Sequence, residues 1–158
     1  MKAAVMERFD GPVPVREVAD PACPPDGVVV AVQACGVCRS DHHMWKGADP
    51  DVVLPCVMGH ELAGEVVDVG PDCRQFSPGD RVTAPFILGC GHCEDCRGGR
   101  VTICEYQHVI GSSSWGAFAE LVALPRADFN VVRLPDELGF VEAAGMGCRV
   151  TTAWRAIV

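Results

Sequence analysis

The sequence predicts a mainly β domain, an irregular β-barrel that ends in short helices. Through the first two-thirds of the chain, short apolar and β-branched runs alternate with turn-forming residues, and 17 glycines and 12 prolines punctuate the sequence. After Pro135 the pattern changes, and apolar residues recur at helical spacing. Many short strands separated by Gly/Pro-rich turns are typical of barrels, so we do not expect a regular strand–helix–strand array.

The strand segments are bounded by turn signals. Asp10-Gly11-Pro12 separates the first two, and Gly70-Pro71-Asp72 ends a run in which valine alternates with polar residues. The expected strands, some with their leading turn, lie in residues 2–7, 13–18, 24–34, 61–73, 77–85 and 115–125.

Two short helices are expected near the end of the chain. Asp136 is a candidate N-cap for the segment DELGFVEAAGMGC, and Thr151 or Thr152 for the segment TTAWRAIV. A dinucleotide-binding fingerprint is absent, because Gly89-Cys90-Gly91 and Gly145-Met146-Gly147 both lack the third glycine.

Composition excludes several classes of function. The net charge is −8 with no run of Lys or Arg, so neither nucleic acid nor an anionic membrane is an expected partner. Acidic residues follow the N-terminus too closely for a signal peptide, and the longest apolar run is too short to span a membrane. We therefore expect a cytoplasmic chain, in which clustered cysteines indicate metal ligands more than disulfides.

Four of the ten cysteines form a C-x2-C-x2-C-x7-C motif, at Cys90, Cys93, Cys96 and Cys104. Two-residue spacers allow successive thiolates to turn toward one tetrahedral centre. Four thiolates fill the coordination sphere of Zn²⁺, so the motif predicts a structural site. An iron–sulfur cluster is the alternative, although the ferredoxin pattern continues with a shorter spacer and Cys-Pro.

A second set of ligand types is dispersed along the chain. Cys38, His60 and Cys148 each stand near glycine, and together they make a Cys2His set that leaves one position of a zinc ion open. Taken singly, Cys148 is equally compatible with a small buried hydrophobe and His60 with a loop histidine.

Four motifs occur in the order seen in one enzyme family: GVCRSDHH, GHELAGEVVDVG, the four-cysteine segment and GCRVTTAW. In these motifs the chain resembles the zinc-dependent alcohol dehydrogenases of the medium-chain dehydrogenase/reductase superfamily. The resemblance implies that residues 1–158 form a GroES-like catalytic domain, a distorted β-barrel. It further implies a structural zinc lobe at 87–107 and helices at 136–158 that lead to a Rossmann domain absent from this sequence.

The resemblance also assigns roles at the zinc sites. Cys38, His60 and Cys148 would hold a catalytic zinc, while the four clustered cysteines would hold a structural zinc. Asp41 matches a carboxylate that orients the ligand histidine, although it could also cap a short helix. Glu61 matches a carboxylate beside the metal.

Other matching positions concern the proton, the cofactor and the substrate. Ser40 and His43 match a relay that carries the substrate proton away, since a hydroxyl both accepts and donates and histidine titrates near neutrality. Ser40 could equally be a loop hydroxyl bonded to its own backbone. Arg39 and Thr152 match contacts to NAD, and Phe86 matches an aromatic of the substrate pocket.

The function implied by this resemblance is oxidation of an alcohol to an aldehyde or ketone with NAD or NADP. The complete enzyme would carry two zinc ions per chain, take a small alcohol or aldehyde, and form a homo-oligomer. Residues 1–158 alone are expected to bind zinc without turnover and to expose apolar surface around residues 151–158. Two alternatives are a non-catalytic zinc-binding or interaction module of the same fold and an electron-transfer protein.

Overall fold

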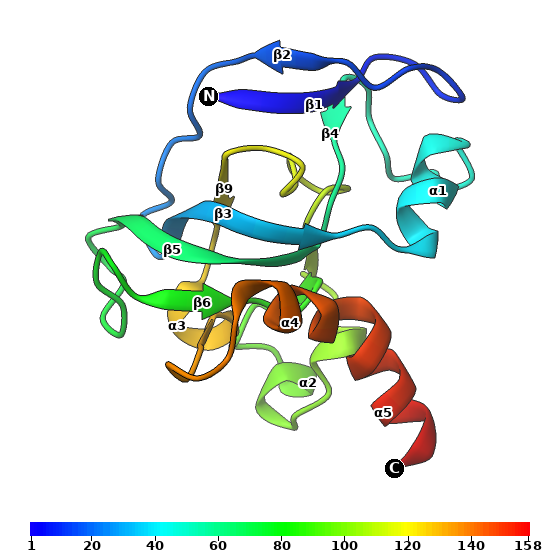
Figure 1. The fold of residues 1–158 in the computed structure, drawn as a ribbon. Helices are drawn as coiled ribbons and strands as arrows, with labels where there is room; N and C mark the ends of the chain where they lie inside the picture. Colours follow the sequence, from blue (N-terminus) through cyan, green and yellow to red (C-terminus); the bar gives the residue numbers. More distant parts are fainter.

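A computed structural model describes residues 1–158, and its framework consists of antiparallel sheets (Figure 1). Two nine-residue strands, β3 (Val28–Gly36) and β5 (Glu61–Val69), pair in the middle of a five-stranded sheet of order β10-β6-β5-β3-β9. The shorter strands of this sheet are β6 (Arg81–Thr83), β9 (Leu121–Leu124) and β10 (Val132–Arg133). The mainly β class predicted from the sequence is confirmed.

Two smaller sheets flank the large one. β1 (Lys2–Met6) lies between β2 (Val15–Glu17) and β4 (Cys56–Val57). The third sheet is the pair β7 (Ile87–Leu88) and β8 (His108–Val109), from which the four-cysteine segment extends.

The sheets do not close into one continuous barrel. β9 and β10 are the edges of the five-stranded sheet, and no strand pairs them with each other. All strands outside the central pair have only two to five residues, so few ladder positions remain to join one sheet to the next.

The helices are short and lie around the sheets (Figure 1). They are α1 (Arg39–Trp45), α2 (Glu94–Arg97), the 3₁₀ turn η1 (Val101–Ile103), α3 (Ala127–Asn130), α4 (Phe140–Gly145), the π-helical segment η2 (Met146–Val150) and α5 (Thr151–Ile157). None of them has both the length and the apolar character needed to cross a membrane.

The expected caps of the C-terminal helices are wrong. Asp136 lies in a turn closed by the bond from Leu138 N–H to the Pro135 carbonyl, and Gly139 is the N-cap of α4. α4 and α5 are joined through η2 across a kink at Gly147, and the helical backbone already includes Val150 before α5 begins. Thr151 therefore lies inside the helical stretch, where it donates its hydroxyl to the Gly147 carbonyl and is not an N-cap.

The main core lies on one face of the large sheet. Alternate residues of β3, β5 and β9 face the same side because successive side chains of a strand point in opposite directions. Its fully buried members include Val28, Val30, Leu62, Val66, Val82, Val122 and Leu124. This packed sheet supports the segment that carries His60, which directly precedes β5.

Candidate metal centres

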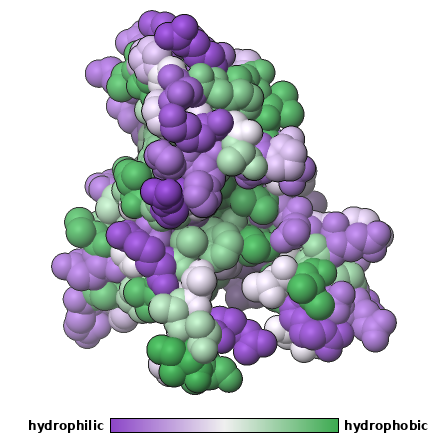
Figure 2. Space-filling model, turned by 90° about the vertical axis from the view of Figure 1, so that its right-hand side faces the viewer, coloured by the Kyte–Doolittle hydropathy of each residue, from purple (hydrophilic) through white to green (hydrophobic).

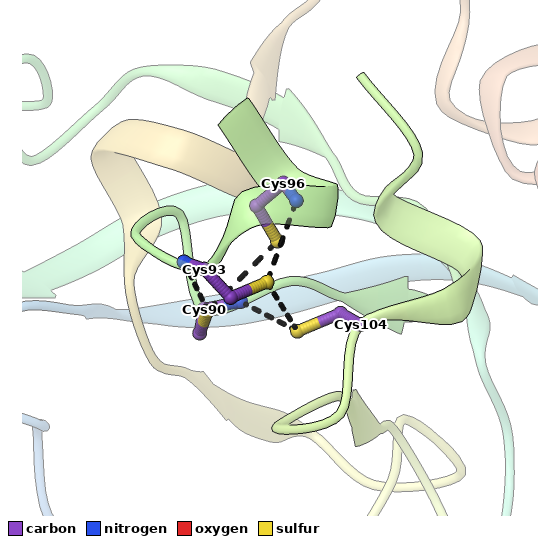
Figure 3. Close-up of side chains that lie close together, drawn as sticks. All are labelled: Cys90, Cys93, Cys96 and Cys104. Atoms are coloured by element: carbon purple, nitrogen blue, oxygen red, sulfur yellow. Dashed lines mark hydrogen bonds between the residues drawn. The ribbon is translucent and has the colours of Figure 1, made fainter. Parts of the chain in front are cut away.

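The four-cysteine cluster is assembled within one short segment between β7 and β8. Cys90 follows β7, Cys93 caps the N-terminus of α2, Cys96 lies inside α2 and Cys104 follows η1. All four sulfurs lie within 4.8 Å of one another (Figure 3). Cys90 and Cys96 have their sulfurs 3.9 Å apart, and Cys93 and Cys104 have theirs 3.8 Å apart. Four thiolates placed tetrahedrally at a Zn–S distance of ~2.3 Å would be ~3.8 Å apart, so the cluster fits zinc.

Backbone N–H groups point at the sulfurs of Cys90 and Cys93. Cys93 N–H donates to the sulfur of Cys90 at 3.3 Å, and Cys96 N–H donates to that of Cys93 at 3.4 Å. Desolvation raises the pKa of Cys90. The backbone N–H groups of His92 and Cys93 and the neighbouring thiols outweigh it, and lower that pKa to about 6. At Cys93 the N–H of Cys96 lowers the pKa, but burial and the neighbouring thiols outweigh it and raise that pKa to about 11.

Asn130 anchors this cluster to the rest of the domain. Its side-chain amide donates to the Gly89 carbonyl at 3.1 Å, and its Oδ1 accepts from Gly89 N–H at 2.8 Å. The side chain is nearly fully buried, so both bonds are shielded from water. The sequence reasoning missed Asn130 because it lies 41 residues from Gly89 and carries no motif.

The second group of ligand types is gathered from three separate elements. Cys38 caps the N-terminus of α1, His60 directly precedes β5, and Cys148 lies in η2. Their ligand atoms all lie within 4.8 Å of one another, and the sulfur of Cys38 is 3.1 Å from His60 Nε2. We call these three residues the three-ligand group. The structure therefore brings together residues that the sequence could associate only by residue type and family resemblance.

Ser40 lies directly against the three-ligand group. Its Oγ is 2.8 Å from the sulfur of Cys38 and 3.0 Å from His60 Nε2. Both Cys38 and Ser40 belong to the N-terminus of α1, Cys38 as its N-cap. His43 follows one turn later on α1 and is exposed, and its ring makes no hydrogen bond to Ser40.

Asp41 connects the backbone around the three-ligand group. Its Oδ2 accepts from Cys38 N–H at 2.8 Å and its Oδ1 from Gly59 N–H at 3.2 Å. The same Oδ1 lies 3.5 Å from His60 Nδ1, and the carboxylate is 3% exposed. Asp41 thus completes the capping box of α1 and also faces the histidine, so both roles considered for it are compatible with this geometry.

The backbone conformation of Gly59 determines how the chain enters His60. Its φ is +94°, a left-handed conformation that glycine adopts without strain, and an added Cβ would lie 2.6 Å from the Phe118 ring. The chain can therefore turn sharply just before His60 and pass close to Phe118.

Glu61 is fully buried beside the three-ligand group and is paired with Arg149. Arg149 donates its backbone N–H and its Nε to Glu61 Oε1 at 3.0 and 3.2 Å, and its Nη2 lies 2.9 Å from Oε2. Sequence reasoning missed Arg149, although it stands next to Cys148 in the motif GCRVTTAW.

Cys148 directly follows the kink at Gly147. It lies in η2, at the start of the helical stretch that continues into α5. Burial, followed by the neighbouring Cys38, raises the pKa of Cys148.

Next to the three-ligand group is a cavity of about 850 Å³. Phe86 lines it and lies with its ring centroid 6.1 Å from that of His60, and Thr152 lines it from α5. The cavity extends between β6, η1 and α5, with mostly apolar walls. Arg39 is exposed on α1 and does not line it.

The far wall of this cavity, α5, projects from the body of the molecule (Figure 1). Every residue of α5 is exposed, including Trp154 at 66% and Ile157 at 82%. Figure 2 views the side from which α5 projects and shows hydrophobic residues gathered at the lower end of that face. The apolar exposure predicted for residues 151–158 is confirmed.

Comparison with known proteins gives consistent matches. Residues 24–136 match the alcohol dehydrogenase GroES-like domain. An alcohol dehydrogenase of Geobacillus stearothermophilus is 42% identical over 99% of this chain and 47% of its own length. A probable zinc-binding alcohol dehydrogenase of Mycobacterium tuberculosis is 38% identical over 99% of this chain and 41% of its own length.

Solved structures give the same result. The alcohol dehydrogenase TADH from Thermus sp. ATN1 superposes with a TM-score of 0.90 at 36% identity, over 98% of this chain and 46% of that one. A cobalt- and zinc-bound thermostable alcohol dehydrogenase from Pyrobaculum aerophilum superposes with a TM-score of 0.89 at 31% identity. This chain spans about half the length of the relatives that it matches.

Proposed function

The chain belongs to the family of alcohol dehydrogenase GroES-like domains, and from this membership we propose that it is the zinc-bearing catalytic domain of an alcohol dehydrogenase. The reaction would be oxidation of an alcohol to an aldehyde or ketone with NAD or NADP. The observation that carries the proposal is the convergence of Cys38, His60 and Cys148 from three separate elements to within 4.8 Å. A Cys2His set is the donor set of a catalytic zinc with one open position.

The donor chemistry of the three-ligand group fits zinc. Two sulfurs and one imidazole nitrogen are borderline-soft ligands, and the carboxylate of Asp41 faces the remaining ring nitrogen of His60. A zinc ion held there would supply Lewis acidity, which makes a nearby hydroxyl group far easier to deprotonate. This is the chemistry that alcohol oxidation requires.

The surrounding residues have distinct proposed tasks. Ser40 would accept the substrate proton, because its hydroxyl lies within hydrogen-bond distance of both Cys38 and His60 and can also donate. The exposed ring of His43, one turn further along α1, would release that proton to solvent. Asp41 would hold a hydrogen on His60 Nδ1, which leaves Nε2 free to bind the metal.

We also propose roles for the residues around the cavity. Phe86, beside His60 on an apolar wall, would contact the carbon skeleton of the substrate. Thr152 would contact the nicotinamide end of NAD(P) from the same cavity. Arg39, exposed at the start of α1, would reach the pyrophosphate.

The four-cysteine cluster is proposed to hold a structural zinc in the lobe at 87–107. Its four sulfurs complete a tetrahedral sphere, so no position is left for a substrate. An iron–sulfur cluster would give a brown protein containing sulfide, whereas the zinc form is colourless. All ten cysteines are free in the structure, which agrees with the proposed cytoplasmic location.

The proposal is tested by counting metal ions. Elemental analysis of the purified chain is expected to give two zinc ions per chain, and the variant Cys148→Ser one. If the unchanged chain holds one zinc and Cys148→Ser holds the same one, the three-ligand group binds no metal and a non-catalytic zinc module is favoured.

A second test concerns turnover. Residues 1–158 contain no dinucleotide fingerprint, so we expect this chain alone to oxidise no alcohol with NAD or NADP. The same residues joined to a nucleotide-binding domain of a close relative are expected to form NADH, and Cys148→Ser in that fusion is expected to form none.

A further inference from the structure

Glu61 depends on one residue for all its polar contacts. Its side chain is 0% exposed, and Arg149 supplies every hydrogen bond and ion pair that it makes. The carboxylate fits there because Gly36 and Gly147 lack side chains. A Cβ on Gly36 would collide with Oε2, and one on Gly147 would lie 3.2 Å from the Glu61 side chain.

The pair joins the two segments that carry His60 and Cys148. His60 directly precedes Glu61 at the start of β5, and Cys148 directly precedes Arg149 in η2. On the other side of Cys148, Gly147 packs against the Glu61 backbone. Cys148 is therefore held between two residues that both contact Glu61.

The backbone of η2 does not fix Cys148 by itself. Gly147 has a ψ of −107°, which interrupts the helical path between α4 and α5, and α5 is exposed along its whole length. The three contacts from Arg149 to Glu61 attach this segment to the start of β5.

We propose that Arg149 is a positioning residue that sets the separation between Cys148 and His60 through its pairing with Glu61. The inference rests on the proposed function, because it requires that the three-ligand group bind a metal. Loss of the pair releases Cys148 from the sheet, so the group binds metal more weakly while the four-cysteine cluster is unaffected.

The test is a cobalt(II) titration of the whole chain. The visible absorption that disappears in Cys148→Ser identifies cobalt in the three-ligand group. Arg149→Met is expected to weaken cobalt binding there about 10- to 100-fold, the usual effect of losing a residue that orients a ligand. Arg149→Lys keeps the charge but not the two-pronged contact, and is expected to recover part of this loss.

The matched control is Arg16→Met. Arg16 lies 3.4 Å from Glu7, and both side chains are more than half exposed, so this change removes an arginine–glutamate pair far from the metal centres. Cobalt affinity is expected to be unchanged in this variant.

A double variant separates positioning from folding. Arg149→Met alone leaves a buried carboxylate unpaired, whereas Glu61→Gln with Arg149→Met leaves no buried charge. A folded double variant with weakened cobalt binding supports the inference. Wild-type cobalt affinity in the folded double variant overturns it, even if the unchanged chain binds two metal ions. If the unchanged chain shows no absorption that depends on Cys148, both this inference and the proposed catalytic site fail.

Discussion

Asp41 and Cys38 lie at opposite nitrogens of the His60 ring. Asp41 Oδ1 is 3.5 Å from Nδ1, and the sulfur of Cys38 is 3.1 Å from Nε2. Because α1 places both residues within one helical turn, a single short helix brings one side chain to each nitrogen of the His60 ring.

The first prediction concerns this orientation. Asp41→Asn replaces the carboxylate that faces His60 Nδ1 with a neutral amide, so zinc binding at the three-ligand group is expected to weaken about 10- to 100-fold. Competition with a chromophoric chelator measures the change. Asp51→Asn, at an exposed aspartate whose side chain makes no hydrogen bond, is the control. Affinity within twofold of the unchanged chain would show that Asp41 serves only as a helix cap.

The second prediction concerns the four-cysteine cluster. Cys96→Ser removes a buried ligand, so the chain is expected to lose one zinc ion and to become sensitive to protease within residues 87–107. The large sheet has its own core and is expected to stay folded. Zinc content and the mass of the proteolytic fragments report both effects. Cys23→Ser, outside both metal centres, should change neither, and an unaltered zinc content in Cys96→Ser contradicts the assignment.

The third prediction uses two glycines with the same backbone conformation. Gly59 and Gly79 both have a φ of +94°, but an added Cβ meets the Phe118 ring at Gly59 and nothing within 4 Å at Gly79. Gly79→Ala is expected to lower the free energy of unfolding by about 1 kcal/mol, because alanine is strained in the left-handed conformation. Gly59→Ala has the same backbone strain and also brings a Cβ into the Phe118 ring and displaces His60. It is expected to lower the free energy of unfolding by about 2–4 kcal/mol. Urea unfolding at one pH measures both, and equal losses would exclude a role for Phe118.

The fourth prediction concerns acid. Arg133, and then the Ser77 backbone N–H, lower the pKa of Asp80 below its ordinary value of 3.8. A carboxylate with a lowered pKa stabilises the folded state above its unfolded pKa, and this contribution is lost as the pH falls through the folded value. Asp80→Asn should therefore be less stable than the unchanged chain at pH 7, with a difference that shrinks below pH ~4.

Urea unfolding at pH 7 and pH 3 measures that difference. The effect is expected to be below about 1 kcal/mol, because the Arg133 side chain is half exposed and water screens the pair. Glu137→Gln, at an exposed glutamate whose side chain makes no hydrogen bond, is the control. A difference that stays constant from pH 7 to pH 3 would rule out the ionised carboxylate as its source.

Sequence patterns predicted the positions of the strands more reliably than the way in which the strands pair into sheets. The nine-residue strands β3 and β5 carry valine runs or alternation over their whole length, and both were predicted. Whether the sheets close depends on pairing between short strands far apart in the chain, which no local pattern specifies. The helix caps near Asp136 and Thr151 were wrong because Asp136 lies in a turn and Thr151 lies in a helical stretch that begins before it, after the kink at Gly147.

The metal centres differ in how far sequence could locate them. The spacing of the four cysteines was enough to predict a metal site, whereas grouping Cys38, His60 and Cys148 into one site required the family resemblance. Neither the spacing nor the resemblance predicted a role for Asn130 or Arg149. Asn130 contacts Gly89, 41 residues away in the sequence, and Arg149 contacts Glu61, 88 residues away. Single polar residues that support a ligand leave no periodic signal.

The two centres also stand at opposite extremes of sequence separation. The cysteines at 90–104 lie within fifteen consecutive residues, so only a short loop must close for them to meet, and metal can enter that segment while the remainder of the polypeptide is still unfolded. The other centre spans 110 residues between its outermost ligands, and it exists only after α1, β5 and η2 have all docked. Metal binding to the three-ligand group therefore reports that tertiary folding is complete. The visible absorption of cobalt bound to this group would follow that step during refolding.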